Sequence, residues 1–319
     1  MQIDTYVLTR SLDDTFPLPR ESPFTAAEAR AAGVRPDQLR ALVGAGVIDR
    51  PLKGVYIAAA VPDNSARRIA CLKRIIPPDC VVALRHAGWV HGAEMILAPG
   101  EHLAQRPISI FRPSGHGRLK NALATTAERE LLPEDVEELD GLLVTTRLRT
   151  TWDLGRVRWP DEAIAGMDAM MRIGGFTHDE LLLGAATRFS GHRWVRTLRA
   201  VAPLVDGRAE SPPESILRLR CVEVGLPVTP QVEVYDGDRF IARLDLADED
   251  LAYALEYDGE EWHGSPDQQR HDRDRRAAVR ELGCEVWEVT KELLFSRDDV
   301  VGRLLREIRD RHRPRRSAA

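Results

Sequence analysis

The stretch Asp245-Leu-Ala-Asp-Glu-Asp-Leu-Ala-Tyr-Ala-Leu-Glu-Tyr-Asp-Gly-Glu-Glu-Trp-His263 combines acidic side chains, a glycine turn and a Trp-His pair in one short segment. It predicts two short strands and their connection, because apolar and polar residues alternate on both sides of the acidic run. Acidic residues are poor strand formers, so acids at inward strand positions need a physical reason. The two reasons that we weigh are a bound metal ion and a solvated edge.

The alternation of strand side chains places Glu256 and Asp258 on one face, together with two small alanines. A solvated turn at residues 248–251 sets Asp245 opposite about Ala254 and diagonal to Glu256, roughly 7–8 Å away along the backbone. Two carboxylates so placed repel each other, and a shared divalent cation removes that repulsion. Ligands that are all oxygen atoms favour Mg²⁺ or Mn²⁺ over zinc.

The acidic stretch lies within a regular succession of predicted elements. Ser211-Pro-Pro-Glu214 predicts the start of a helix that ends near Gly225, and Asp236-Gly237 predicts a hairpin turn. The pattern predicts a helix, three strands, a helix, a strand and a last helix, the later elements being at residues 267–282, 285–290 and 300–311. The Gly- and Pro-containing segment 206–213 predicts a linker in front of this domain.

This C-terminal pattern resembles the PD-(D/E)XK nuclease fold, in particular its branch related to the very-short-patch-repair endonucleases. The resemblance implies a restriction-endonuclease-like domain of the order αβββαβ, in which Asp245 and Glu256 hold Mg²⁺ and Glu214 supports them. The motifs that carry it are Ser211-Pro-Pro-Glu214-Ser215, Asp245, Glu256-Tyr-Asp258-Gly259, Trp262-His263-Gly264 and the charged run from His271 to Arg276.

The chain departs from classical members of that fold at one position. Those members carry a lysine two residues after the glutamate, where this chain has Asp258, and no lysine occurs within residues 121–290. The attacking water is therefore expected to be activated by the metal, with Asp258 or His263 as the proton acceptor. Arg273 or Arg276 is expected to neutralise the phosphate charge.

Structural alternatives stay open for three of these residues. Glu214 occupies the third helical position of a Ser-x-x-Glu capping box, Asp258 begins an Asp-Gly turn signal, and His263 fits ordinary packing. Asp245 and Glu256 favour a metal role more strongly, because both are expected on one face of adjacent strands.

The N-terminal residues predict a small DNA-binding module. Thr25-Ala-Ala-Glu28 is a capping box that opens a short helix, Pro36 opens a second helix, and residues 47–57 predict two strands around a basic turn. Two helices and a basic hairpin form the winged helix-turn-helix plan, and an ordinary solvated helical face is the alternative. The candidate DNA contacts are Arg35, Gln38 and Arg40 on the second helix and Arg50 and Lys53 on the hairpin.

The same N-terminal segment resembles the winged helix of the AbiEi-like antitoxin family. The resemblance covers residues 24–57 and is carried by Ala32-Gly33-Val34, by Leu39 to Val43 and by Lys53-Gly54-Val55-Tyr56.

The middle of the chain predicts a mixed α/β region without a catalytic constellation. Helices are expected at residues 65–76 and 81–94, and strands at 108–111 and 142–146. The following Arg147-Leu-Arg-Thr-Thr-Trp-Asp-Leu154 segment enters a helix and resembles the AbiEi-like family. His86 and His91 are expected to be structural, and the region as a whole is expected to be a scaffold or a partner surface.

Composition places the chain among soluble globular proteins. It has 319 residues, of which 43% are apolar and 30% charged, with a net charge of −5. The four cysteines lack the spacing of a zinc site, so buried free thiols are expected. No apolar run is long enough to span a bilayer and the N-terminus lacks a secretory pattern, so we expect a cytoplasmic protein without membrane association.

Together these patterns predict a multidomain α/β (α+β) protein with a winged helix-turn-helix at residues 1–63, an α/β region at 64–205 and a nuclease-like domain at 206–319. The expected function is metal-dependent hydrolysis of DNA. The alternative is an antitoxin-like transcriptional regulator whose nuclease fold is inactive. DNA is the expected partner, RNA stays open as a target, and the resemblances allow a cognate toxin or a repair protein as a further partner.

Overall fold

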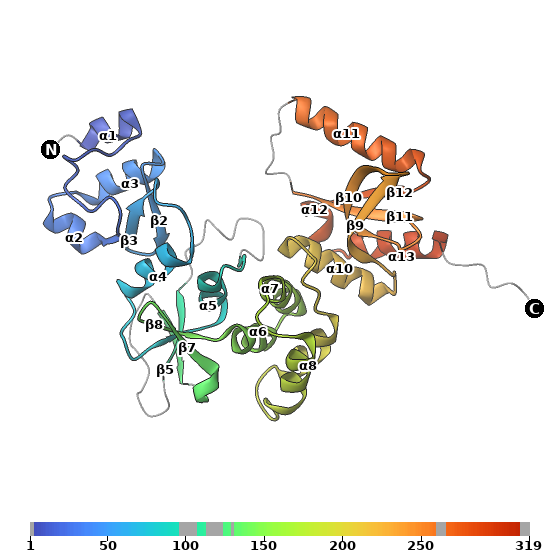
Figure 1. Ribbon diagram of the computed structural model, residues 1–319, viewed down its shortest axis with the longest axis horizontal. Coiled ribbons are helices and arrows are strands. Elements are labelled where there is room, and N and C mark those ends of the chain that lie inside the picture. Colours follow the sequence, from blue (N-terminus) through green and yellow to red (C-terminus); the bar gives the residue numbers. More distant parts are fainter. Residues whose placement is uncertain (1–2, 96–106, 113–123, 129–130, 260–265, 313–319) are drawn as a thin grey trace, which may run out of the picture. The chain divides into compact units, whose positions relative to one another are not determined.

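The computed structural model describes residues 3–95, 107–112, 124–128, 131–259 and 266–312 (Figure 1). Contacts divide the chain into two compact units. Unit 1 comprises residues 1–95 and 100–153, and unit 2 comprises residues 96–99 and 154–319. Helices combine with three mixed or antiparallel sheets, which confirms the predicted α+β class.

A three-stranded antiparallel sheet, ordered β1-β3-β2, packs with three helices in unit 1. The predicted capping box is confirmed: the Thr25 hydroxyl accepts from Glu28 N, and the Glu28 carboxylate accepts from Thr25 N. Phe24, Leu42 and Ile48 are buried in its core. The elements are α1 (Ile3–Thr9), β1 (Phe24–Thr25), α2 (Ala26–Ala31), α3 (Pro36–Gly44), β2 (Ile48–Leu52) and β3 (Val55–Ala58).

A five-stranded mixed sheet, ordered β6-β5-β4-β8-β7, forms the rest of unit 1. The prediction of one helix over residues 81–94 was wrong. Val81 and Val82 form a strand, because they pair with β5 on one side and β8 on the other, and the helix begins at Leu84. The elements are α4 (Ser65–Lys73), β4 (Val81–Val82), α5 (Leu84–His91), β5 (Ile108–Arg112), β6 (Ala124–Glu128), a 3-10 turn (Pro133–Asp135), β7 (Val136–Leu139) and β8 (Leu142–Thr145).

The two histidines of α5 have structural roles, as predicted. Ser109 N donates to His86 Nδ1 over 3.1 Å, and His91 Nε2 lies 2.8 Å from the Thr145 carbonyl oxygen. The predicted helix after residue 146 is α6 (Arg147–Gly155). Its Arg149 is buried between Asp135 and Asp153, at 2.6 and 2.7 Å, so this charge is balanced inside the unit.

Unit 2 begins with helices that join the C-terminal domain rather than stand apart from it. Arg218 of α10 (Pro212–Val224) forms a 2.7 Å ion pair with the fully buried Asp168 of α7 (Pro160–Ile173). Asp206 N donates to the same carboxylate. The predicted linker at 206–213 therefore lies inside unit 2. The elements are α7 (Pro160–Ile173), α8 (His178–Thr187), α9 (Val195–Val201), a 3-10 turn (Ala202–Leu204) and α10 (Pro212–Val224).

A four-stranded sheet, ordered β12-β11-β10-β9, is the centre of unit 2. Its strands alternate between two cores: Leu246 and Leu255 pack in the cluster that includes α10 and α13, whereas Ala247 and Ala254 pack in the cluster that includes Val279 of α11. Figure 1 shows α11 on the face opposite α10 and α13. The elements are β9 (Thr229–Asp236), β10 (Arg239–Ala247), β11 (Tyr253–Asp258), α11 (Pro266–Glu281), β12 (Glu285–Thr290), α12 (Lys291–Leu294) and α13 (Val300–His312).

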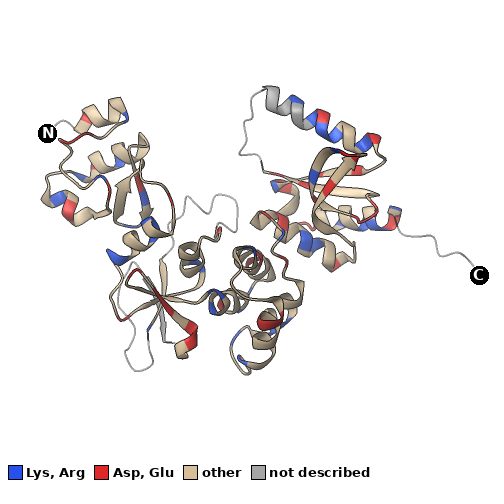
Figure 2. Ribbon diagram, viewed as in Figure 1, with Lys and Arg blue, Asp and Glu red and all other residues tan. Residues whose placement is uncertain are grey.

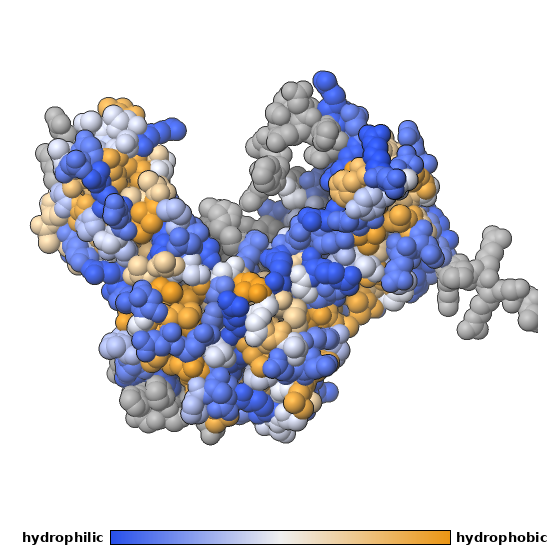
Figure 3. Space-filling view, in the orientation of Figure 1, coloured by the Kyte–Doolittle hydropathy of each residue, from blue (hydrophilic) through white to orange (hydrophobic). Residues whose placement is uncertain are grey.

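This order confirms the predicted succession of helices and strands, with α12 as the one short helix that the sequence pattern did not indicate. The surfaces of both units mix hydrophilic and hydrophobic residues (Figure 3). All four cysteines are free and buried, as predicted. Within the described ranges, every helix falls short of the length or the apolar character that crossing a bilayer demands.

Candidate functional site

The pairing of β10 with β11 brings Asp245 closer to Glu256 than the sequence predicted. Leu246 pairs with Leu255 and Ala247 with Ala254, so the same register sets Asp245 directly across from Glu256. The predicted diagonal placement, with Asp245 opposite about Ala254, was wrong by two residues. Directly opposed antiparallel residues have their Cβ atoms about 4.5–5.5 Å apart, and the two carboxylates therefore belong to one cluster.

Glu214 joins this cluster from the N-terminal end of α10. Its side chain is buried, and Glu214 Oε2 accepts hydrogen bonds from Glu210 N and from Gln231 Nε2, both over 2.9 Å. The Ser211 hydroxyl caps the helix by accepting from Glu214 N. A capping box would also require the Glu214 carboxylate to accept from the backbone N–H of Ser211. In the structure the carboxylate accepts from the backbone N–H of Glu210 instead.

Asp245 has an unusual electrostatic environment. Burial, together with the charges of Glu214 and Glu256, raises the pKa of Asp245 to about 7, although a 2.9 Å hydrogen bond from Tyr257 N and the charge of Arg275 act in the opposite direction. A carboxyl group in this position keeps its proton near neutral pH unless a cation compensates the neighbouring acids. This combination of desolvation and like charge is typical of functional sites.

Glu256 differs from Asp245 because two arginines of α11 contact it. Arg276 Nε lies 3.2 Å from Glu256 Oε2, and Arg275 Nη2 lies 3.5 Å from Glu256 Oε1. Arg276 also pairs with Glu288 of β12, which is the parallel-strand partner of Glu256. Figure 2 shows the charged residues of both signs along the described part of α11. The negative charge of Glu256 is therefore balanced by arginines, whereas Glu214 accepts hydrogen bonds from uncharged groups and raises the pKa of Asp245.

The other predicted catalytic residues lie at the edge of this cluster or outside the described residues. Asp258 is the exposed last residue of β11, and its charge acts on Arg276. Arg273 is exposed on α11. His263 and its neighbour Trp262 fall outside the described residues.

The cluster has the donor chemistry of a site for a hard divalent cation. Its donors are carboxylate oxygens, and a cation would relieve the repulsion that raises the pKa of Asp245. Among the described residues, no three His, Cys, Asp or Glu side chains already converge as a ready-made metal centre. Asp245 and Glu256 are the two carboxylates that could hold such a cation, with Glu214 beside them, and Arg275 and Arg276 now contact the oxygens of Glu256.

The candidate DNA contacts of unit 1 are mostly at the surface. Arg40 and Lys53 are exposed, and the guanidinium of Arg50 lies 5.8 Å from the Tyr56 ring centroid. Arg35 forms an ion pair with Asp37 at 2.9 Å.

Gln38 has a further role that the sequence analysis did not include. Its side-chain oxygen accepts from Arg35 N over 2.9 Å and so caps α3. The amide is thereby engaged at the start of the helix that carries the other candidate contacts.

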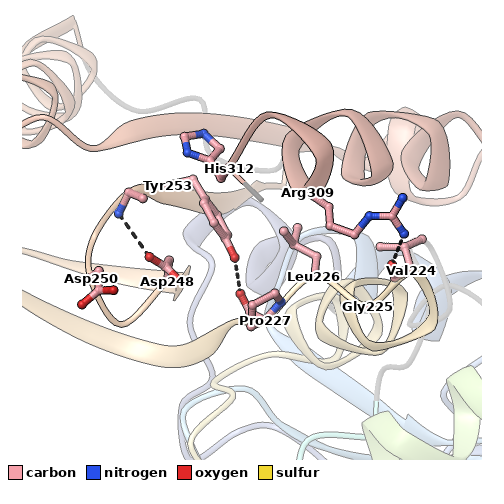
Figure 4. Close-up of a pocket in the computed structure, with 10 residues that line it drawn as sticks. Val224, Gly225, Leu226, Pro227, Asp248, Asp250, Tyr253, Arg309 and His312 are labelled. Atoms are coloured by element: carbon pink, nitrogen blue, oxygen red, sulfur yellow. Dashed lines mark hydrogen bonds between the residues drawn. The ribbon is translucent and has the colours of Figure 1, made fainter. Parts of the chain in front are cut away.

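A separate cavity of about 580 Å³ lies at the start of β11, away from the carboxylate cluster (Figure 4). The Tyr253 hydroxyl donates to the Pro227 carbonyl oxygen over 2.6 Å, and Arg309 Nη1 donates to the Val224 carbonyl oxygen over 2.7 Å. Tyr253 and Arg309 thus form hydrogen bonds with other residues of the cavity wall. None of the predicted site residues lines this cavity.

Sequence reasoning missed three residues of the site. Gln231 supports Glu214, Arg275 contacts Glu256, and Glu288 holds Arg276. The charged run of α11 was a signal for Arg275, because it adjoins the predicted Arg276. Gln231 and Glu288 carry no signal in the sequence, since their roles depend on strand pairing.

No protein-family model matches the chain. Two similar proteins come from two strains of Mycobacterium tuberculosis and bear the names uncharacterized protein MT2308 and uncharacterized protein Rv2248. Each is 29% identical over 247 residues, which cover 77% of this chain and 86% of the relative. Neither name states an activity, so the functional argument depends on the residues of the site.

Proposed function

We propose that unit 2 hydrolyses DNA phosphodiester bonds with the help of Mg²⁺ or Mn²⁺. The observation that carries the proposal is the raised pKa of Asp245, about 7, caused by burial and by two neighbouring acids. Acids are concentrated there at an energetic cost that a bound cation removes. The order of elements and the motifs around Glu214, Asp245 and Glu256 support a PD-(D/E)XK nuclease domain related to the very-short-patch-repair endonucleases.

The residues of the chain divide the work of such a reaction. Asp245 and Glu256 would hold the cation, and Glu214 would hold a water molecule or a further ligand position beside them. When bound, the cation supplies an activated water and stabilises the negative charge of the transition state. Asp258, which is exposed at the end of β11, or His263 would accept the proton of the attacking water. The arginines of α11 balance negative charge.

Unit 1 would supply the contacts that hold the protein on DNA. The proposed winged helix uses the exposed Arg40 on α3 and Lys53 in the β2–β3 hairpin to bind phosphates. This division suits a chain whose C-terminal domain carries an excess of acidic residues.

A nicking assay tests the proposal directly. The full chain with Mg²⁺ is incubated with supercoiled plasmid and with single-stranded DNA and RNA, beside Asp245→Ala, Glu256→Ala and the matched surface control Glu249→Ala. We expect nicking by the unaltered chain and by Glu249→Ala, and a loss of about 100-fold or more in the two site variants. Absence of Mg²⁺-dependent cleavage of every substrate refutes the proposal, and cleavage of RNA alone reassigns the substrate.

A second candidate function is an antitoxin-like transcriptional regulator with an inactive nuclease fold. Such a regulator would have a cognate toxin as its protein partner. The observation that favours it is the contact of Glu256 with Arg275 and Arg276, because these guanidinium groups stand where a cation would bind. It predicts salt-sensitive binding to operator DNA that Arg40→Ala weakens and Asp245→Ala leaves unchanged. Gel-shift titrations of both variants at several salt concentrations test this binding, and the nicking assay distinguishes the regulator, which binds DNA without cleaving it, from the nuclease.

A further inference from the structure

Two acidic residues on neighbouring strands share one arginine. Glu256 and Glu288 are paired residues of the parallel strands β11 and β12, so their side chains lie on the same face and repel each other. Arg276 bridges them, with Nε 3.2 Å from Glu256 and Nη1 paired with Glu288. Arg275 adds a contact of 3.5 Å to the other oxygen of Glu256. Both oxygens of Glu256 are thus in contact with cationic groups.

The same oxygens are required by the proposed cation. A guanidinium and a divalent cation carry like charge, so they compete for Glu256 rather than bind it together. Cation binding therefore requires Arg275 and Arg276 to be drawn away from Glu256. Arg276 has an alternative anchor in Glu288, and Arg275 has a side chain that is 36% exposed, so both arginines can turn outward without leaving a buried charge unbalanced.

A phosphate group is the anion that suits this exchange. The planar fork of a guanidinium matches phosphate oxygens in the same bidentate geometry that it uses for carboxylates. We propose that Arg276, with Arg275, couples the binding of a nucleic-acid phosphate to cation binding at Glu256. The arginines hold Glu256 when no phosphate is present, and a phosphate takes them over and frees Glu256 for the cation.

The coupling must act in both directions. If the phosphate raises the affinity for the cation, the cation raises the affinity for the phosphate by the same factor. The free chain then binds the cation weakly, and the DNA-bound chain binds it tightly. The site is therefore loaded with the cation mainly when DNA is bound. This inference rests on the proposed function, because it takes Glu256 as a cation ligand.

The experiment measures Mn²⁺ affinity by isothermal titration of the full chain, so that it does not depend on cleavage. Each variant is titrated alone, with a duplex of phosphorothioate DNA that resists hydrolysis, and with a methylphosphonate duplex whose backbone is neutral. The variants are Arg276→Ala, Arg276→Lys, which keeps the charge but not the fork, Asp245→Asn and the matched control Arg270→Ala, an exposed arginine of α11.

We expect phosphorothioate DNA to raise the Mn²⁺ affinity of the unaltered chain and of Arg270→Ala about tenfold, within the usual range of couplings, and methylphosphonate DNA to leave it unchanged. Arg276→Ala should bind Mn²⁺ tightly without DNA and lose the DNA effect, with Arg276→Lys between the two. If Asp245→Asn abolishes Mn²⁺ binding while DNA and Arg276→Ala leave it unchanged, the coupling is refuted and the proposed function stands. Absence of Mn²⁺ binding in every variant refutes both.

Discussion

Unit 2 contains two strongly desolvated aspartates that differ in their neighbours. Asp168, on α7, receives Arg218 at 2.7 Å and Asp206 N at 2.8 Å, and burial still raises its pKa. Asp245, on β10, receives one backbone N–H and faces Glu214 and Glu256. The contrast separates an acid whose buried charge has a cationic partner from an acid that is set among other acids, whose charged form therefore lacks that compensation.

The largest effect is expected at the paired aspartate. Asp168→Asn leaves the buried Arg218 without its carboxylate, and removing one partner of a buried ion pair costs about 3–5 kcal/mol. The free energy of unfolding, from urea denaturation at about pH 8, should fall by that amount. Asp245→Asn is the matched isosteric variant and should not be destabilised under the same conditions. Equal losses in the two variants would show that the contrast between these aspartates is incorrect.

Next in size is the effect of pH on the second aspartate. The folded-state pKa of Asp245 is about 7, above its ordinary value of 3.8. The folded state therefore binds the proton more tightly, so this group makes the chain less stable as pH rises from about 4 to about 7. One pKa unit corresponds to about 1.4 kcal/mol, and partial exposure reduces the sum to about 2–4 kcal/mol.

Denaturation of Asp245→Asn at several pH values measures this effect. The variant should match the unaltered chain near about pH 3, below the ordinary pKa of 3.8, where the carboxyl group is protonated in both states, and should exceed it above about pH 7. A difference between the two proteins that is the same at all pH values would contradict the raised pKa.

A bound cation should cancel the same penalty. Mn²⁺ at 100 times its dissociation constant stabilises a folded state by about 2.7 kcal/mol, provided that it does not bind the unfolded chain. We expect this stabilisation near pH 8 and little of it near pH 5, because protons compete for Asp245 below its pKa of about 7. Thermal unfolding with and without Mn²⁺ measures it. An equal shift in Asp245→Asn would place the cation elsewhere.

The elements of this region were predictable from the sequence, whereas its contacts were not. The strand at residues 285–290 has the bounds that the pattern predicted, because short apolar alternation and a preceding glycine define it locally. The register of β10 on β11 depends on the connection between them, and the predicted register was wrong by two residues. The bridge from Glu256 through Arg276 to Glu288 depends on parallel pairing across a helix, which no local pattern encodes.

The predicted linker shows why composition misled at the other aspartate. Gly207 and the prolines that follow are typical of a flexible boundary. In the structure, Gly207 packs against the backbone of α7, where an added Cβ would lie 2.8 Å from Arg172 N. A glycine required for close approach looks the same in a sequence as one that gives flexibility. For this reason the Asp168–Arg218 contact, and the association of α7 with the C-terminal domain, were not predicted.

The smallest effect separates the two acids that act on Asp245. Glu214 raises the pKa of Asp245 more than Glu256 does, and the charge of Glu256, unlike that of Glu214, has the arginine partners Arg275 and Arg276. Glu214→Gln should therefore lower that pKa by on the order of one unit, or about 1.4 kcal/mol. Glu256→Gln should lower it less.

Carboxyl ¹³C shifts of Asp245, followed by NMR through a pH titration of each variant, report the order of these effects directly. The glutamine variants keep the shape of the side chain, so a change in burial does not imitate a change in charge. If Glu256→Gln produced the larger decrease, the arginines of α11 would not be balancing Glu256. Glu256 would then be an uncompensated acid and an available cation ligand in the free chain. Asp245 and Glu256 would both differ from the paired Asp168 in the same way, so the presence of arginine partners would not explain the contrast.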